Sequence, residues 1–160
     1  MAEETMKKVL LAIISLLFIA CQHNVVYTEF KSIPNKGWHS DSAIHFDAVL
    51  TDSLSDYTVT MTMRHTDRYA YQNLWLFVDI VQDSLLLRRD TVNAMLADNQ
   101  GKWYGSGVFV KELEMVYLNN IVLPLGEYQI VLQQAMRTEM LNGISDIGLK
   151  IIKNTEDGKE

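Results

Sequence analysis

The 160-residue sequence lacks the features that indicate a crosslinked, modular or nucleic-acid-binding protein. It contains a single cysteine, Cys21, so no intramolecular disulfide can form. No Pro/Gly/Ser-rich linker and no internal repeat divides the chain, which favours one globular domain. Acidic residues outnumber Lys and Arg by 20 to 14, and no basic patch appears, so nucleic acid is not an expected partner.

Sequence motifs for catalysis are also missing. The chain has no Gly-x-Ser-x-Gly elbow, no His-Glu-x-x-His metal pair and no Walker-type phosphate loop. A hydrolase could draw only on the isolated acids Asp79, Asp98 and Glu127. We therefore predict that the protein is not an enzyme and needs no cofactor.

Two histidines lie near acids, as metal ligands often do. His45 with Asp47, and His65 near Asp67, supply fewer groups than the three or four convergent ligands of a metal site. We therefore interpret both as surface histidines and predict no metal site. Asp79 lies in the most apolar segment; an ion pair with Arg64, Arg88 or Arg89 is the favoured interpretation, and a buried catalytic acid is the alternative.

The N-terminus has the pattern of a secretory signal. Lys7 and Lys8 precede an apolar run from Val9 to Ala20, which is shorter than the roughly 20 residues of a transmembrane helix. Met6 is favoured as the true start, because two glutamates within residues 1–5 are unusual ahead of such a run. We therefore predict that residues 1–20 form a signal helix that is cleaved.

Cys21 follows the apolar run directly. Phe18-Ile19-Ala20-Cys21 resembles the bacterial lipobox, in which the cysteine receives a thioether-linked diacylglycerol, although Phe18 replaces the usual leucine. The alternative is an ordinary secretory signal with an incidental cysteine. We predict lipidation of Cys21, anchorage to a membrane through that lipid, and a short tether over residues 21–24.

Alternation of apolar and polar residues dominates the rest of the chain and predicts strands. In one such segment Met61 and Met63 should face the core, while Thr60 and Thr62 should face water. Residues 74–81 are apolar at nearly every position and should form a central strand covered on both faces. The expected strands cover residues 25–30, 44–50, 57–64, 74–81, 85–91, 107–110, 115–122, 128–133 and 147–152.

These strands predict an all-β domain over residues 25–153, followed by a polar tail over residues 154–160. Eight or nine strands with frequent turns favour a two-sheet antiparallel β-sandwich, jelly-roll or immunoglobulin-like, over a barrel. The only helical prospects are two short segments, Val92–Ala97 and Ala135–Leu141.

Aromatic residues next to glycines supply a candidate binding surface. Trp38, Trp103 and Tyr104 lie in such loops and could form a platform for a sugar or a peptide, with core packing as the alternative. Trp75, inside the apolar segment 74–81, is interpreted as a core residue.

Several segments together resemble a known family. They are, in order, Ile33-Pro34 with Gly37-Trp38, Tyr57 and Arg64, Tyr69 and Tyr71 before Asn73-Leu74-Trp75-Leu76-Phe77, Asp90-Thr91, Leu96-Ala97-Asp98, Gly101-Lys102-Trp103 with Gly105 and Gly107, Gly126-Glu127-Tyr128, Gln134-Ala135-Met136-Arg137 and residues 141–148. With the lipobox, this order resembles the gliding-motility lipoprotein H (GldH) family of the Bacteroidetes. The resemblance covers most of the chain after Cys21.

The resemblance implies an envelope lipoprotein needed for surface gliding and associated with the machinery that also serves type IX secretion. It implies no catalytic residues. The leading hypothesis is a non-catalytic protein that contacts other envelope proteins; the alternative is a glycan-binding β-sandwich lipoprotein. Surface-displayed lipoproteins of this phylum resemble one another in carrying acids just after the cysteine, and residues 22–26 contain none. We therefore predict a periplasm-facing domain at the cell membrane or the outer membrane.

Overall fold

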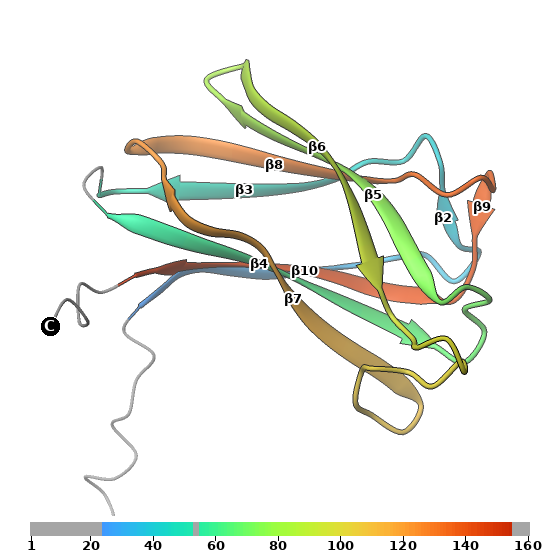
Figure 1. Cartoon of the computed structure of the whole chain (residues 1–160). Coiled ribbons are helices and arrows are strands. Elements are labelled where there is room, and N and C mark those ends of the chain that lie inside the picture. Colours follow the sequence, from blue (N-terminus) through green and yellow to red (C-terminus); the bar gives the residue numbers. More distant parts are fainter. Residues whose placement is uncertain (1–23, 53–54, 155–160) are drawn as a thin grey trace, which may run out of the picture.

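The computed structural model describes residues 24–52 and 55–154 and shows two antiparallel sheets packed face to face (Figure 1). In the first sheet the strand order is β1 (Val25–Ser32), β10 (Ile144–Lys153), β4 (Asp56–Thr66) and β7 (Val110–Val122). In the second it is β3 (Ile44–Leu50), β8 (Gly126–Gln134), β5 (Asn73–Gln82) and β6 (Leu85–Met95). A short ladder joins β2 (Trp38–His39) to β9 (Met140–Leu141). The predicted all-β sandwich is confirmed.

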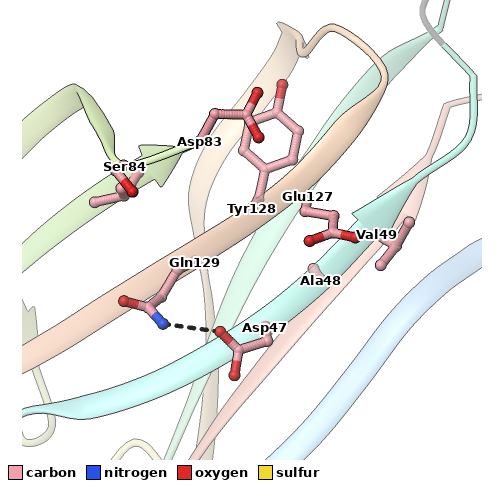
Figure 2. A pocket seen from close by; sticks show the side chains of 9 residues that line it. Asp47, Ala48, Val49, Asp83, Ser84, Glu127, Tyr128 and Gln129 are labelled. Carbon is pink, nitrogen blue, oxygen red and sulfur yellow. Dashed lines mark hydrogen bonds between the residues drawn. The ribbon is translucent and has the colours of Figure 1, made fainter.

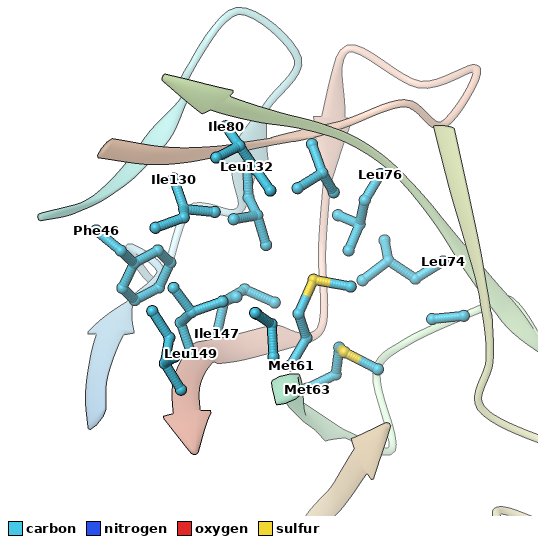
Figure 3. Packing of buried hydrophobic residues seen from close by; sticks show 14 of the residues in the cluster. Phe46, Met61, Met63, Leu74, Leu76, Ile80, Ile130, Leu132, Ile147 and Leu149 are labelled. Carbon is cyan, nitrogen blue, oxygen red and sulfur yellow. The ribbon is translucent and has the colours of Figure 1, made fainter. Parts of the chain in front are cut away.

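The core lies between the sheets and is built by alternate residues of the inner strands (Figure 3). Met61 and Met63 of β4 are fully buried, as predicted, and lie in one cluster with Leu74 and Leu76 of β5. Burial of an alternating face sets the register, because a shift of one residue would turn every apolar side chain outward.

The strand β4 departs from the prediction on its outer face. Thr60 and Thr62 are buried instead of facing water, because β4 lies between β10 and β7 in the middle of its sheet. Thr62 is paired with Gly148, and the Phe30 ring covers that glycine so closely that an added Cβ would lie 2.5 Å from it. The Arg64 guanidinium lies 4.0 Å from the centroid of the same ring.

The strand β5 was expected to be covered on both faces, and this is wrong. It is central in its sheet, between β8 and β6, but only one face is buried. Leu74, Leu76 and Val78 point into the core, while Trp75 and Phe77 lie on the outer face. No layer covers that side within the described residues, so the apolar run marks an exposed apolar surface.

Both predicted helices are strand or loop in the structure. Residues 92–95 continue β6, where Ala94 pairs with Leu74, so cross-strand pairing overrides the local helical pattern. After β8, the Ala135 N–H donates to the Trp75 carbonyl at 2.8 Å, and Met140 and Leu141 then pair with β2. No helix long and apolar enough to cross a membrane is found among residues 24–52 and 55–154.

Strand register defines two ends of the sandwich. At the N-terminal end Val25 pairs with Ile152; at the opposite end, which we call the far end, Thr66 pairs with Val110. The 11 residues of β4 run between the two ends, and at roughly 3.3 Å per residue they span about 35 Å. The predicted signal peptide, Cys21 and most of the polar tail lie outside the described residues.

Methionine burial gives the first prediction. Met61→Ala should lower the free energy of unfolding by about 2–5 kcal/mol, because it leaves a cavity between the sheets. Thr60→Ala should cost about 1 kcal/mol, because Thr60 is buried and its hydroxyl lies 3.5 Å from the Lys150 carbonyl. Urea unfolding of both variants measures the difference; equal losses would contradict the assigned faces.

Candidate functional site

The candidate binding residue Trp38 lies inside the protein. Its side chain is only 2 % exposed, and its indole N–H donates a hydrogen bond to the Ser42 carbonyl at 2.7 Å. The short pairing of β2 with β9 holds this residue against the core at the far end. Trp38 therefore offers no ring face to a ligand.

Trp103 and Tyr104 lie in the segment between β6 and β7, also at the far end. The Trp103 ring is partly buried and tilted against His65, with ring centroids 4.3 Å apart. Tyr104 is exposed, and its backbone N–H donates to the Leu96 carbonyl at 2.9 Å. The structure therefore does not gather the three aromatic residues into one exposed platform, and a glycan-binding role now depends mainly on Tyr104.

His65 is buried instead of lying on the surface. Its Nδ1 lies 3.3 Å from the Thr66 carbonyl oxygen, and no described residue hydrogen-bonds its Nε2. Burial lowers the pKa of His65 below its usual 6.5, because an imidazolium would lose its hydration there. A neutral His65 ring in tilted contact with Trp103 is part of the packing at the far end.

The acids expected for other roles are held in local contacts. Asp79 accepts two hydrogen bonds from the Arg89 guanidinium, at 2.7 and 2.6 Å, which confirms the predicted ion pair. These bonds keep the pKa of Asp79 below its ordinary value, so it stays ionised. Asp98 accepts the backbone N–H groups of Gln100 and Lys102 and closes a turn.

The third acid, Glu127, lines a shallow cavity of about 460 Å³ at the N-terminal end of the second sheet (Figure 2). Asp47 and Asp83 line the same cavity, and Asp47 accepts a hydrogen bond from Gln129 at 2.9 Å. The part of the chain that the structure describes contains no group of three His, Cys, Asp or Glu side chains able to hold a metal ion. No His, Lys or Arg side chain accompanies the acids among the residues that line this cavity.

The exposed surface that sequence reasoning missed lies on the outer face of β5 and β6. Trp75 and Phe77 are 39 % and 46 % exposed, and Met95 lies diagonally across from Trp75. Met136 adjoins them, since its sulfur accepts the Trp75 backbone N–H at 3.3 Å. We call the exposed residues Trp75, Phe77 and Met95 the outer-face patch; Met136 borders it but is half-buried and also packs against the core. One feature of the sequence could have revealed this surface. Asp79 alternates with the buried residues in step with Trp75 and Phe77, so all three lie on the same face of the strand, and a charged carboxylate is expected on the face toward solvent.

Comparison with known proteins identifies the family. The model of the GldH lipoprotein family matches residues 25–151. The chain belongs to the GldH lipoprotein family. It is 30% identical over 150 residues to the gliding motility lipoprotein GldH of Flavobacterium johnsoniae, covering 89% of this chain and 93% of that one. It is 32% identical over 148 residues to a GldH homolog of Christiangramia forsetii, covering 87% and 90%.

Membership of this family makes the chain a lipoprotein associated with an envelope membrane and with gliding motility. Among solved structures, chicken MD-1 in complex with lipid IVa aligns with a TM-score of 0.40 and 12% identity, over 82% of this chain and 97% of that chain. A likeness at this level indicates neither function nor ligand. The GldH resemblance expected from the sequence is confirmed.

His65 predicts a pH dependence of stability. Because the folded pKa is lowered, the unfolded chain binds the proton more readily. The contribution of neutral His65 to the free energy of unfolding should be fully present above about pH 6.5. It should be lost as the pH falls from there to the lower pKa of His65 in the folded protein. The carboxyl of Asp67 opposes this shift and the ammonium of Lys111 adds to it.

Urea unfolding between pH 5 and pH 8 tests this dependence. His65→Phe should remove the loss of stability below pH 6.5, whereas the matched change of exposed His45 to Phe should leave it in place. An unchanged profile in His65→Phe would show that His65 is not the titrating group.

Proposed function

We propose that this GldH-family domain is a non-catalytic docking component of the gliding and type IX secretion-associated machinery. It is held to a membrane by lipid on Cys21 and faces the periplasm. The observation that carries this proposal is the outer-face patch, which exposes two aromatic side chains and the Met95 side chain on one face of a sheet. Aromatic residues and methionine are the apolar residues most enriched in protein interfaces.

The composition around the patch supports a protein partner. An apolar centre with a polar rim is the usual anatomy of a protein interface. Here Asn73 donates to Asn93 at 2.8 Å on one side of Trp75, and the Arg89–Asp79 pair lies beyond Phe77. Methionine side chains adapt their shape to a partner surface.

Anchorage supports the same role. Gln22 to Asn24 is a very short link between Cys21 and β1. Such a link keeps the domain close to its leaflet and raises its effective concentration toward membrane-associated partners, into the mM range. The patch lies toward the far end of β5, so it stays accessible above the membrane.

Anchorage and orientation can be tested together. Wild-type protein should incorporate an alkyne fatty acid and resist proteinase K added to intact cells, because the lipidated domain lies in the periplasm. Cys21→Ala should lose the label completely and remain uncleaved. Label on Cys21→Ala would contradict lipidation at this residue, and digestion without permeabilisation would contradict the periplasmic orientation.

Docking through the patch can be tested by cross-linked co-purification of the tagged, full-length lipoprotein. Trp75→Ser with Phe77→Ser should lower the yield of specific envelope partners by about tenfold or more, which corresponds to about 1.4 kcal/mol. The melting temperature should change little, because both side chains lie on the surface. Val49→Ser, on the same face at the N-terminal end, is the matched control; equal yields from all three proteins would refute the proposal.

A further inference from the structure

Another cavity, of about 390 Å³, lies at the far end of the first sheet. Three turns that are distant in the sequence line it: residues 32–37 at the end of β1, residues 66–68 at the end of β4, and residues 142–145, which lead into β10. These strands pair with one another, so their ends meet at the end of the sandwich opposite Val25 (Figure 1). Strand pairing therefore creates a cavity that no single segment of the sequence contains.

Backbone hydrogen bonds hold the three turns together. The Ile33 N–H donates to the Ser145 carbonyl at 2.8 Å, and the Thr66 N–H donates to the Gly143 carbonyl at 2.8 Å. Each bond joins a residue after one strand to a residue of a different turn. Because these bonds fix the walls of the cavity before a ligand arrives, binding requires less ordering of the protein.

Gly143 is required for two of the turns to meet. Its φ is 94°, and an added Cβ would lie 2.3 Å from the Tyr69 backbone nitrogen. Only glycine adopts this conformation without strain and permits so close an approach. The Tyr69 N–H donates to the Thr66 carbonyl at 3.1 Å and closes the turn that carries Arg68. Gly143 thus lets this turn lie beside Asn142.

The guanidinium of Arg68 is available to a ligand. Arg64 and Arg89 each pair with a carboxylate on a neighbouring strand, at 2.6 Å in both cases. Arg68 lines the cavity, and its side chain makes no hydrogen bond or ion pair with any residue that the structure describes. A free guanidinium can donate two parallel N–H bonds to a carboxylate.

Two acids lie close to Arg68 in the fold, but neither lines the cavity. Asp67 is exposed to water, and Asp146 accepts a hydrogen bond from the Ser32 hydroxyl at 2.8 Å. Among the described lining residues Arg68 is the only charged one. The two carboxylates reduce the long-range attraction of an anion, so recognition depends on direct hydrogen bonds from the guanidinium.

The remaining lining residues indicate the rest of the ligand. Asn35 and Asn142 line the cavity from separate turns, and neither side chain hydrogen-bonds within the described parts of the chain. Each amide supplies two N–H donors and a carbonyl acceptor. Ile33 and Ile144, which are both buried, add apolar residues to the lining. A carboxylate beside an amide and a small apolar side chain would match all of these groups.

We infer that this cavity binds the terminal carboxylate of a short peptide whose last side chain is small and apolar. Arg68 holds the carboxylate through paired hydrogen bonds, Asn35 and Asn142 bond the peptide amide, and Ile33 and Ile144 contact the side chain. The volume suits a small group, since ligand cavities range from about 300 to 1,000 Å³. This binding function goes beyond docking and does not depend on the outer-face patch.

NMR titration of the full-length lipoprotein in detergent micelles tests the inference. N-acetyl-alanyl-alanine with a free carboxylate should cause saturable shifts in the amide signals of Arg68 and Gly143, and its C-terminal amide should bind about tenfold more weakly. Arg68→Gln should weaken binding of the free acid by about tenfold or more, and Arg68→Lys by less, because lysine keeps the charge without the planar fork. Arg137→Gln, at another exposed arginine outside the lining, is the matched control and should bind like the wild type.

Other outcomes overturn the inference. Equal binding of the acid and its amide, equal binding by the wild type and Arg68→Gln, or no saturable shift would show that Arg68 does not recognise a peptide carboxylate. Acetate that binds as tightly as the peptide would show a simple anion site, and glucuronate that binds more tightly would show a sugar-acid site. The Trp75→Ser, Phe77→Ser protein should bind the peptide like the wild type, so failure of the docking proposal would leave this inference in place.

Discussion

Burial of one face of β4 against one face of β5 is the constraint on which the rest of the structure depends. Met61 and Met63 can be buried only if the even-numbered residues of β4 point outward, and Leu74 and Leu76 impose the same condition on β5. Which alternate residues of β4 and β5 face the core also determines which side chains lie on the outer faces of the two sheets, including those of the outer-face patch. At the β6–β7 side of the sandwich, the Tyr117 hydroxyl donates to Asp90 at 2.6 Å and links the two sheets.

The far end shows how the core positions a surface feature. The tilted contact between the Trp103 ring and the buried His65 ring holds the segment between β6 and β7 against the end of the sandwich. From that base the chain forms the turn at Gly107 and exposes Phe109. A neutral imidazole suits this role, because it packs like an aromatic ring while a charged one would require solvation.

The local alternation of apolar and polar residues predicted much of the fold. The predictions were wrong where the same pattern is compatible with two different structures. The strand β3 has the predicted bounds, and eight further predicted segments lie wholly or partly within strands. The prediction for residues 74–81 was wrong because an apolar run occurs both in strands that are covered on one face and in strands that are covered on both faces. The prediction that Thr60 faces water was wrong because burial of a polar residue on the outer face depends on neighbouring strands that lie far away in the sequence.

The sequence by itself determined the all-β class and the family, because two-residue periodicity and the order of short segments are local properties of the chain. The tertiary structure alone decided which aromatic residues lie inside. Trp38 is enclosed where β2 meets β9, about 100 residues apart, and Trp75 is left outside by the parity of β5. The candidate surface therefore moved from loop tryptophans to a sheet face, because exposure depends on strand pairing between distant segments.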